Sequence, residues 1–265
     1  TDRIVNREMT EQEERDSRKK KIPVKDAYYQ LINNNVLSLK AMEQEDAGAV
    51  EQEIHRKFIA SRQQILTNMR SQLADVNAPP ISALGEDMKS YMLYVYSYLS
   101  QDTVGIIQRS KIDSESPEAN GWKEESISLR DYLYYGISQD WIDTTKLPVD
   151  NKYSNADDSF HALVDYVMEQ LENDTQFTKR IYRYLINQDI ITGRELCMAL
   201  YSQNILPYDE EQMRLLSAGG EDYAFSFLID KINNLEITPA QLALDPCTAG
   251  CTVIDVNTGK VLALV

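Results

Sequence analysis

Residues 43–74 read EQEDAGAVEQEIHRKFIASRQQILTNMRSQLA, and this stretch decides the fold class of the chain. Apolar side chains recur in it at spacings close to 3.6 residues, while charged and amide side chains occupy the other positions. The periodicity predicts one long amphipathic α-helix, which ends at the NAPP sequence of residues 77–80 because proline cannot continue a helix. The apolar stripe consists of Ala47, Val50, Ile54, Phe58, Ile65, Met69 and Leu73.

The segments on either side of this helix are also helical in pattern. Residues 1–21 carry an acidic cluster followed by a basic one, which is typical of a charged helix or linker. Residues 82–100 predict a second amphipathic helix, and the turn formers of residues 110–125 predict a polar loop. The SLRD sequence of residues 128–131 predicts a capping box that begins the next helix.

The second half of the chain predicts a rapid succession of shorter helices. Residues 150–157 form a polar connection, after which apolar faces recur at helical spacing. Further starts are expected at the TGRE capping box of residues 192–195, at Asp209 and at Thr238. No period of 20–50 residues repeats, which argues against a solenoid. The predicted apolar faces are Phe160, Leu163, Val164, Val167, Met168 and Leu171, then Phe177, Ile181, Tyr184 and Leu185.

Only the C-terminal residues switch to strand periodicity. Residues 251–256 predict a β-strand, residues 257–259 a turn at Gly259, and residues 260–265 a second strand. The predicted fold class is therefore mainly α, a multi-helix, bundle-like body with a short C-terminal β-hairpin. Because a lone hairpin is marginally stable in water, the pattern suggests a piece of a larger protein whose sheet begins here.

These patterns predict four consecutive segments. They are a charged N-terminal linker or helix (1–21), a helical subdomain (22–156), a second helical subdomain (157–245) and the hairpin (246–265).

Composition excludes some classes of partner. The chain has 265 residues, a 43% hydrophobic share and a net charge of −15. Such an acidic balance argues against nucleic-acid binding and against peripheral binding to anionic membranes. No apolar run approaches the ~18 residues of a membrane span, and no signal-peptide pattern begins the sequence.

Metal-ligating and redox residues are sparse. His55 and His161 are the only histidines, and neither has a second ligand at a zinc-type spacing nearby. Cys247 and Cys251 form a C-x-x-x-C pair that lacks the other two ligands of a structural zinc site; they are two small thiols or a local disulfide. The third cysteine is Cys197. We therefore expect no metal, no cofactor and no catalytic residue in this chain.

The last fifteen residues, CTVIDVNTGKVLALV, resemble the first hairpin of the transpeptidase domain of penicillin-binding proteins. The lead-in at residues 235–246 and the ITGRELC sequence of residues 191–197 are similar to the helical linker of class B enzymes. The absence of a glycosyltransferase-like segment upstream favours class B over class A. The matching positions are Val253, Asp255, Thr258, Gly259, Val261, Leu262 and Ala263.

The resemblance implies a membrane-anchored parent that crosslinks peptidoglycan by D,D-transpeptidation through an acyl-serine that penicillin also acylates. This chain would be its non-catalytic, extracytoplasmic spacer or partner-docking region, joined to the transpeptidase domain and attached to the membrane only through an upstream anchor. Elongation or division proteins would be its partners.

The catalytic motifs that the family uses are not completed here. The SRKK sequence from Ser17 to Lys20 matches S-x-x-K by letter but lies in a charged run, where no desolvated lysine activates the serine. Ser202 to Asn204 (SQN) matches S-x-N, but no K-T-G or K-S-G follows. We therefore expect this chain not to be an enzyme, whereas its parent is a serine D,D-transpeptidase.

Two alternatives remain open. The chain is an independent helical scaffold or adaptor whose tail pairs with a partner's sheet, or an enzyme with an unfamiliar site of carboxylates and tyrosines. A natural stop near Val265 would indicate the first, and a deep pocket with two perturbed carboxylates the second.

Overall fold

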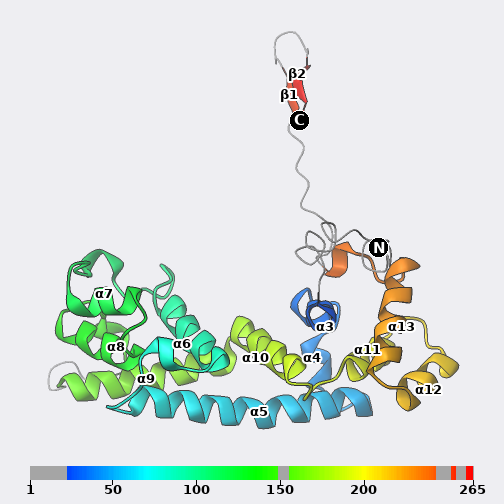
Figure 1. Cartoon of the computed structure of the whole chain (residues 1–265), viewed down its shortest axis with the longest axis horizontal. Coiled ribbons are helices and arrows are strands. Elements are labelled where there is room, and N and C mark those ends of the chain that lie inside the picture. Colours follow the sequence, from blue (N-terminus) through cyan, green and yellow to red (C-terminus); the bar gives the residue numbers. More distant parts are fainter. Residues whose placement is uncertain (1–22, 149–154, 243–251, 255–260, 265) are drawn as a thin grey trace, which may run out of the picture. The chain divides into compact units, whose positions relative to one another are not determined.

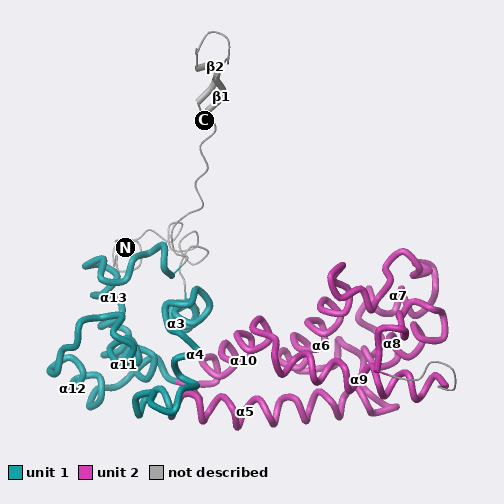
Figure 2. Tube along the Cα trace, turned by 180° about the vertical axis from the view of Figure 1, so that it is seen from behind, with its two compact units in different colours: residues 1–52, 192–265 teal, residues 53–191 magenta. Residues whose placement is uncertain are grey.

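The computed structural model describes residues 23–148, 155–242, 252–254 and 261–264. The chain divides into two compact units (Figure 2): unit 1 contains residues 1–52 and 192–265, and unit 2 contains residues 53–191. Unit 1 is thus assembled from both ends of the chain, whereas unit 2 is continuous. The boundary predicted between residues 156 and 157 falls inside unit 2, so the observed division differs from the predicted one.

The regular elements of unit 2 are helices, which in its described residues are joined by loops and by a β-bridge between Ile107 and Ile142. Helices α7 and α9 both pack against α8, α10 packs against α9, and η1 packs against α6. The elements are most of α5 (Ala49–Ala74), η1 (Ile81–Ala83), α6 (Glu86–Leu99), η2 (Arg109–Lys111), α7 (Pro117–Lys123), α8 (Leu129–Ser138), η3 (Thr144–Lys146), α9 (Ala156–Asn173) and α10 (Thr175–Asn187).

Unit 1 is organised around one central helix. Helix α11 packs against α3, α12 and α13, and α3 also packs against η4. The helices are α3 (Val24–Asn33), α4 (Leu39–Met42), the first residues of α5, α11 (Gly193–Ser202), α12 (Glu210–Ala218), α13 (Glu221–Asn233) and η4 (Ala240–Leu242).

The long helix predicted from the apolar stripe is α5, drawn in cyan and blue in Figure 1. It has 26 residues, which corresponds to a length of about 39 Å. Its buried stripe runs from Ile54 to Leu73, whereas Ala47 and Val50, which the prediction also placed in the stripe, are only half-buried. Its start was predicted too early, because residues 43–48 form the turn between the short helix α4 (Leu39–Met42) and α5.

The shorter helices begin at side chains that cap them. Capping boxes are present at Asn155 of α9 and at Thr192 of α11, and the latter was predicted. At α8 only half of the predicted capping box forms: the Ser128 hydroxyl accepts from the Asp131 N–H, but the Asp131 carboxylate accepts from that hydroxyl instead of from the Ser128 N–H. These bonds satisfy backbone donors that have no partner within a helix.

One predicted loop is wrong. Residues 110–125 contain helix α7 rather than a continuous polar loop. Ser116 caps this helix by accepting from the Ala119 N–H, and Pro117 occupies the first helical turn, where its missing N–H costs nothing. The Ser-Pro sequence of residues 116–117 therefore marks the start of a helix, not a loop.

A single type of connection recurs between the helices. Every non-glycine residue with positive φ among the described residues lies immediately after the C-cap of a helix. In most copies a buried Ile or Leu follows two positions later, and its N–H donates to the carbonyl six residues before it, as Ile191 does to Leu185. This geometry satisfies helix-end carbonyls and turns the chain. The residues are Asn35, Glu125, Asp140, Asp189, Asn204 and Leu235.

The predicted fold class requires a correction. The described residues form a helical protein, and the C-terminal β-hairpin of residues 246–265 is not present in the predicted form. Only β1 (Thr252–Ile254) and β2 (Val261–Leu264) are described there, paired with an irregular register, and the predicted turn lies outside the described residues. A two-stranded ribbon of three and four residues is too short to add a stable layer. The fold class is therefore α.

Candidate functional site

The most enclosed polar cluster in unit 1 surrounds a carboxylate. Glu51, in the first turn of α5, is only 4% exposed. Its carboxylate accepts hydrogen bonds from the Gly48 N–H (3.0 Å), from the Gln203 amide (2.9 Å) and from the Ser202 hydroxyl. Gln203 in turn accepts from the Ser38 N–H and donates to the Ser38 carbonyl. We call these five residues the Glu51 network.

The backbone of Gly48 lies close to the Ser202 hydroxyl of the Glu51 network. A Cβ at Gly48 would lie 2.3 Å from the Ser202 oxygen, so one side of this half-buried side chain faces Gly48. A nucleophilic serine needs a base and also an approach path for the carbonyl that it attacks. The geometry therefore fits a fastening between the start of α5 and the end of α11, rather than a catalytic pair.

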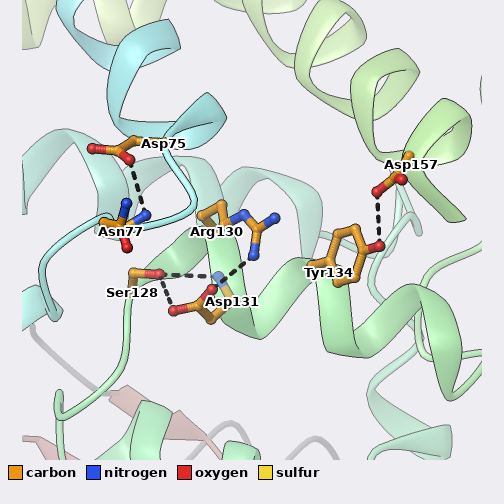
Figure 3. A network of polar contacts seen from close by, with 7 residues as sticks. All are labelled: Asp75, Asn77, Ser128, Arg130, Asp131, Tyr134 and Asp157. Atoms are coloured by element: carbon orange, nitrogen blue, oxygen red, sulfur yellow. Dashed lines mark hydrogen bonds and ion pairs between the residues drawn. The ribbon is translucent and has the colours of Figure 1, made fainter.

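Unit 2 has a corresponding cluster around Arg130 (Figure 3). The Arg130 guanidinium donates to Asp131 at 3.0 Å and lies 4.7 Å from the centre of the Tyr134 ring. The Tyr134 hydroxyl donates to Asp157 at 2.7 Å and so connects α8 to the start of α9. Hydrogen bonding to Asp157 raises the pKa of the Tyr134 phenol, which keeps it a donor. This cluster also joins helices and leaves no group poised as an acid or base.

The helices at the two clusters share a short sequence pattern. Residues 128–131 (SLRD) begin α8, and residues 192–195 (TGRE) begin α11. The same helices end at residues 138–140 (SQD) and 202–204 (SQN), each with a left-handed last residue. Each unit thus contains one copy, and only the copy in unit 1 uses its Ser-Gln pair to bind a buried carboxylate.

Two short sequences match catalytic motifs by letter, and the structure describes one of them. The sequence from Ser202 to Asn204 lies at the C-terminal end of α11, where Asn204 has a φ of +54° and forms the turn. Ser202 belongs to the Glu51 network, so its match to S-x-N is explained by helix termination. The match from Ser17 to Lys20 lies outside the described residues.

The histidines and cysteines are not brought together. His55 lies beside Phe58 on α5, and the exposed His161 ring contacts the Asp157 carbonyl of its own helix. Cys197 is fully buried in α11, and burial raises the pKa of its thiol far above the usual range. Cys247 and Cys251 lie outside the described residues.

Within the described ranges, no group of three or more His, Cys, Asp and Glu side chains could hold a metal ion. In the same ranges, no helix is both long enough and apolar enough to span a membrane.

Tyrosines form a large part of the helical packing. Phe177 packs its ring against Tyr91 and Tyr94, and Phe58 stacks on Tyr182 at 4.6 Å. Burial is the main cause that raises the pKa of Tyr98 to about 12 and that of Tyr201 to about 12. The same direction and main cause apply to the phenols of Tyr28, Tyr91, Tyr94 and Tyr132.

These pKa shifts predict a loss of stability in alkali. The folded protein holds phenol protons more tightly than the unfolded chain, whose tyrosines ionise near pH 10. The contribution of these tyrosines to the free energy of unfolding should therefore be constant from neutral pH to about pH 9 and fall as the pH rises from about 10 toward 12. Urea unfolding at pH 8, 10 and 11, with absorbance at 295 nm to follow ionisation, measures this. A single titration of all tyrosines near pH 10 in the folded protein would contradict it.

Comparisons with family models, with curated proteins and with solved structures find no match to this chain.

Sequence reasoning missed the Glu51 network, because Glu51 reads as one more charged residue of an amphipathic helix. Its partners lie 151 and 152 residues away, and no local pattern specifies such a pairing. One signal was available: the first turn of α5 pairs Gly48 with Glu51 at the spacing of a helix start.

Proposed function

We propose that this chain is the non-catalytic, extracytoplasmic spacer of a penicillin-binding protein that crosslinks peptidoglycan. The observation that carries the proposal is the ordered resemblance of residues 251–265 to the start of a transpeptidase domain. Class B is favoured over class A. In this role the helical units connect an upstream membrane anchor to the catalytic domain and offer a docking surface to elongation or division proteins.

Features of the described residues are consistent with a spacer. Helix α5 alone is about 39 Å long, and its residues belong to both units. The polar clusters at Glu51 and Arg130 join one helix to another, as a rigid spacer requires. The hydroxyls of Ser202 and Ser128 each donate to a carboxylate, Ser202 to Glu51 and Ser128 to Asp131, and both contacts lie at helix ends.

Labelling with a fluorescent penicillin tests the proposal. The full-length gene product should become covalently labelled, and unlabelled penicillin should block this. The chain of 265 residues should stay unlabelled at the same concentration, because the acylated serine belongs to the catalytic domain. Labelling of this chain alone, or a gene that encodes no S-x-x-K within about a hundred residues after Val265, would contradict the proposal.

The alternative function is an independent helical scaffold or adaptor, and it makes the opposite prediction for the gene sequence after Val265. It predicts a stop codon near Val265 and no penicillin labelling of any product of the gene. The Glu51 and Arg130 clusters fit it equally well, so the sequence downstream discriminates between the two.

A further inference from the structure

Unit 2 contains a pocket of about 400 Å³ formed by the loop that follows α6. Its volume lies in the range of ~300–1,000 Å³ that is typical of small-molecule sites. All of its lining residues fall between 100 and 110, and all except Gly105 and Ile107 have polar or charged side chains. The residues that matter for a ligand are Ser100, Gln101, Asp102, Gln108 and Arg109.

The loop is held in place by the segment after α8. Ile107 pairs with Ile142, the Gln108 N–H donates to the Trp141 carbonyl at 2.8 Å, and the Asp143 N–H donates to the Ile106 carbonyl at 2.8 Å. The pocket wall is therefore pre-formed, which lowers the entropy cost of binding.

Gly105 completes this wall. It has a φ of +58°, and its carbonyl accepts from the Lys146 ammonium at 3.0 Å. A Cβ at this position would lie 2.6 Å from the Lys146 nitrogen, so a larger residue would displace the lysine.

A hydroxyl that lines the pocket has no partner. Ser100 is the C-cap of α6 and is only 2% exposed, yet its hydroxyl forms no hydrogen bond in the structure. A buried hydroxyl without a partner costs about 1–3 kcal/mol, which a hydrogen bond to a ligand would offset.

Two opposite charges line the same pocket without pairing. Arg109 and Asp102 form no ion pair with each other or with any other residue in the part of the chain that the structure describes. Both side chains are exposed and therefore hydrated in the free protein, and a ligand with a single charge could engage only one of them. A ligand that carries both charges satisfies the two together.

We propose that this pocket binds a small zwitterion, an α-amino acid or a short peptide with both termini free. The ligand's carboxylate pairs with Arg109, its ammonium group pairs with Asp102, and the Ser100 hydroxyl hydrogen-bonds to it between these two charges. This site goes beyond the spacer role and does not depend on it.

Calorimetric titration of the whole chain with alanyl-alanine tests the proposal. Alanyl-alanine should bind, whereas N-acetyl-alanyl-alanine and alanyl-alanine amide, which each lack one charge, should bind at least ten-fold more weakly. Arg109→Gln and Asp102→Asn should each weaken alanyl-alanine binding at least ten-fold. The Asp102→Asn variant should bind N-acetyl-alanyl-alanine as well as alanyl-alanine, because it lacks the carboxylate that pairs with the ligand's ammonium group.

Ser100→Ala separates ligand binding from folding. Because the hydroxyl has no partner in the free protein, its removal should leave the melting temperature equal or higher while weakening alanyl-alanine several-fold. Arg56→Gln and Asp222→Asn, at exposed positions outside the pocket, serve as charge-matched controls and should bind normally. The proposal is overturned by no binding at 10 mM dipeptide, by equal affinity for the blocked peptides, or by unchanged affinity in the Arg109 and Asp102 variants.

Discussion

Phe177→Ala should lower the free energy of unfolding of unit 2 by about 3–5 kcal/mol, the range for removing a buried aromatic ring. Phe177 lies near the start of α10 and is 0% exposed. Its ring lies edge-on to Tyr91 at 5.6 Å and stacks on Tyr94 at 5.9 Å, so the substitution leaves a cavity lined by rings that cannot collapse without moving α6.

Urea unfolding followed by tyrosine fluorescence and circular dichroism measures this loss. Phe225→Ala is the matched control: the same change is made at a side chain that is 41% exposed, so it removes much less buried area. Equal destabilisation by both variants would show that Phe177 is not in the core.

Glu51→Ala should destabilise unit 1 by about 2–4 kcal/mol, because it leaves three donors of the Glu51 network without an acceptor. Two of these donors, Ser202 and Gln203, hold the end of α11 to the start of α5. Faster amide hydrogen exchange should therefore appear in α11 and around Ser38, whereas unit 2 should exchange at the original rate.

Glu53→Ala is the control for this second variant. Glu53 lies two residues further along the same helix, and its pKa is lowered mainly by a hydrogen bond from the exposed Arg56. Removing such a surface pair should not change the unfolding curve measurably. If Glu51→Ala and Glu53→Ala gave the same exchange pattern, the proposal that Glu51 holds the end of α11 to the start of α5 would be wrong.

The sequence predicts the helices of this protein well where apolar spacing is regular. The stripe from Ile54 to Leu73 was predicted correctly, because burial of one helix face leaves a 3.6-residue period. The six residues predicted for the buried face of α9 are also buried, but the small residues Ser159 and Ala162 of that face were not predicted. Helix starts were predicted where a Ser, Thr or Asp cap precedes an apolar run, as at Thr192 and Asp209.

The failures have local and non-local causes. The sequence does not predict helix α7, because Ser116 and Pro117 at its start are also common in loops. The hairpin was predicted from a short β-rich stretch. Among the described residues no third strand pairs with it, so it adds no stable sheet to the fold. The Glu51 network could not be predicted, because its partners meet only in three dimensions. The pocket is lined by one local segment, but the conformation of that loop depends on its pairing with residues 141–143.

The recurring turn could have been predicted from sequence. Its copies share a polar residue at the C-cap, a residue in the left-handed region next, and Ile or Leu two positions later, often with a helix cap after that. Examples are NNNVLS at residues 33–38, NQDIIT at 187–192 and NNLEIT at 233–238. These spacings are irregular, so a search for a fixed period did not detect them.

The discontinuity of unit 1 sets the order in which this protein can be completed during synthesis. Residues 53–191 leave the ribosome as one continuous segment whose contacts are largely between neighbouring helices, so unit 2 can fold while the rest is being translated. The N-terminal residues 23–52 must wait for α11, because Glu51 finds its partners only when residues 202 and 203 have emerged. Completion of unit 1 therefore closes two long loops, one of 151 residues where Glu51 meets Ser202 and one of 207 residues where Asn34 at the end of α3 meets Gln241 of η4.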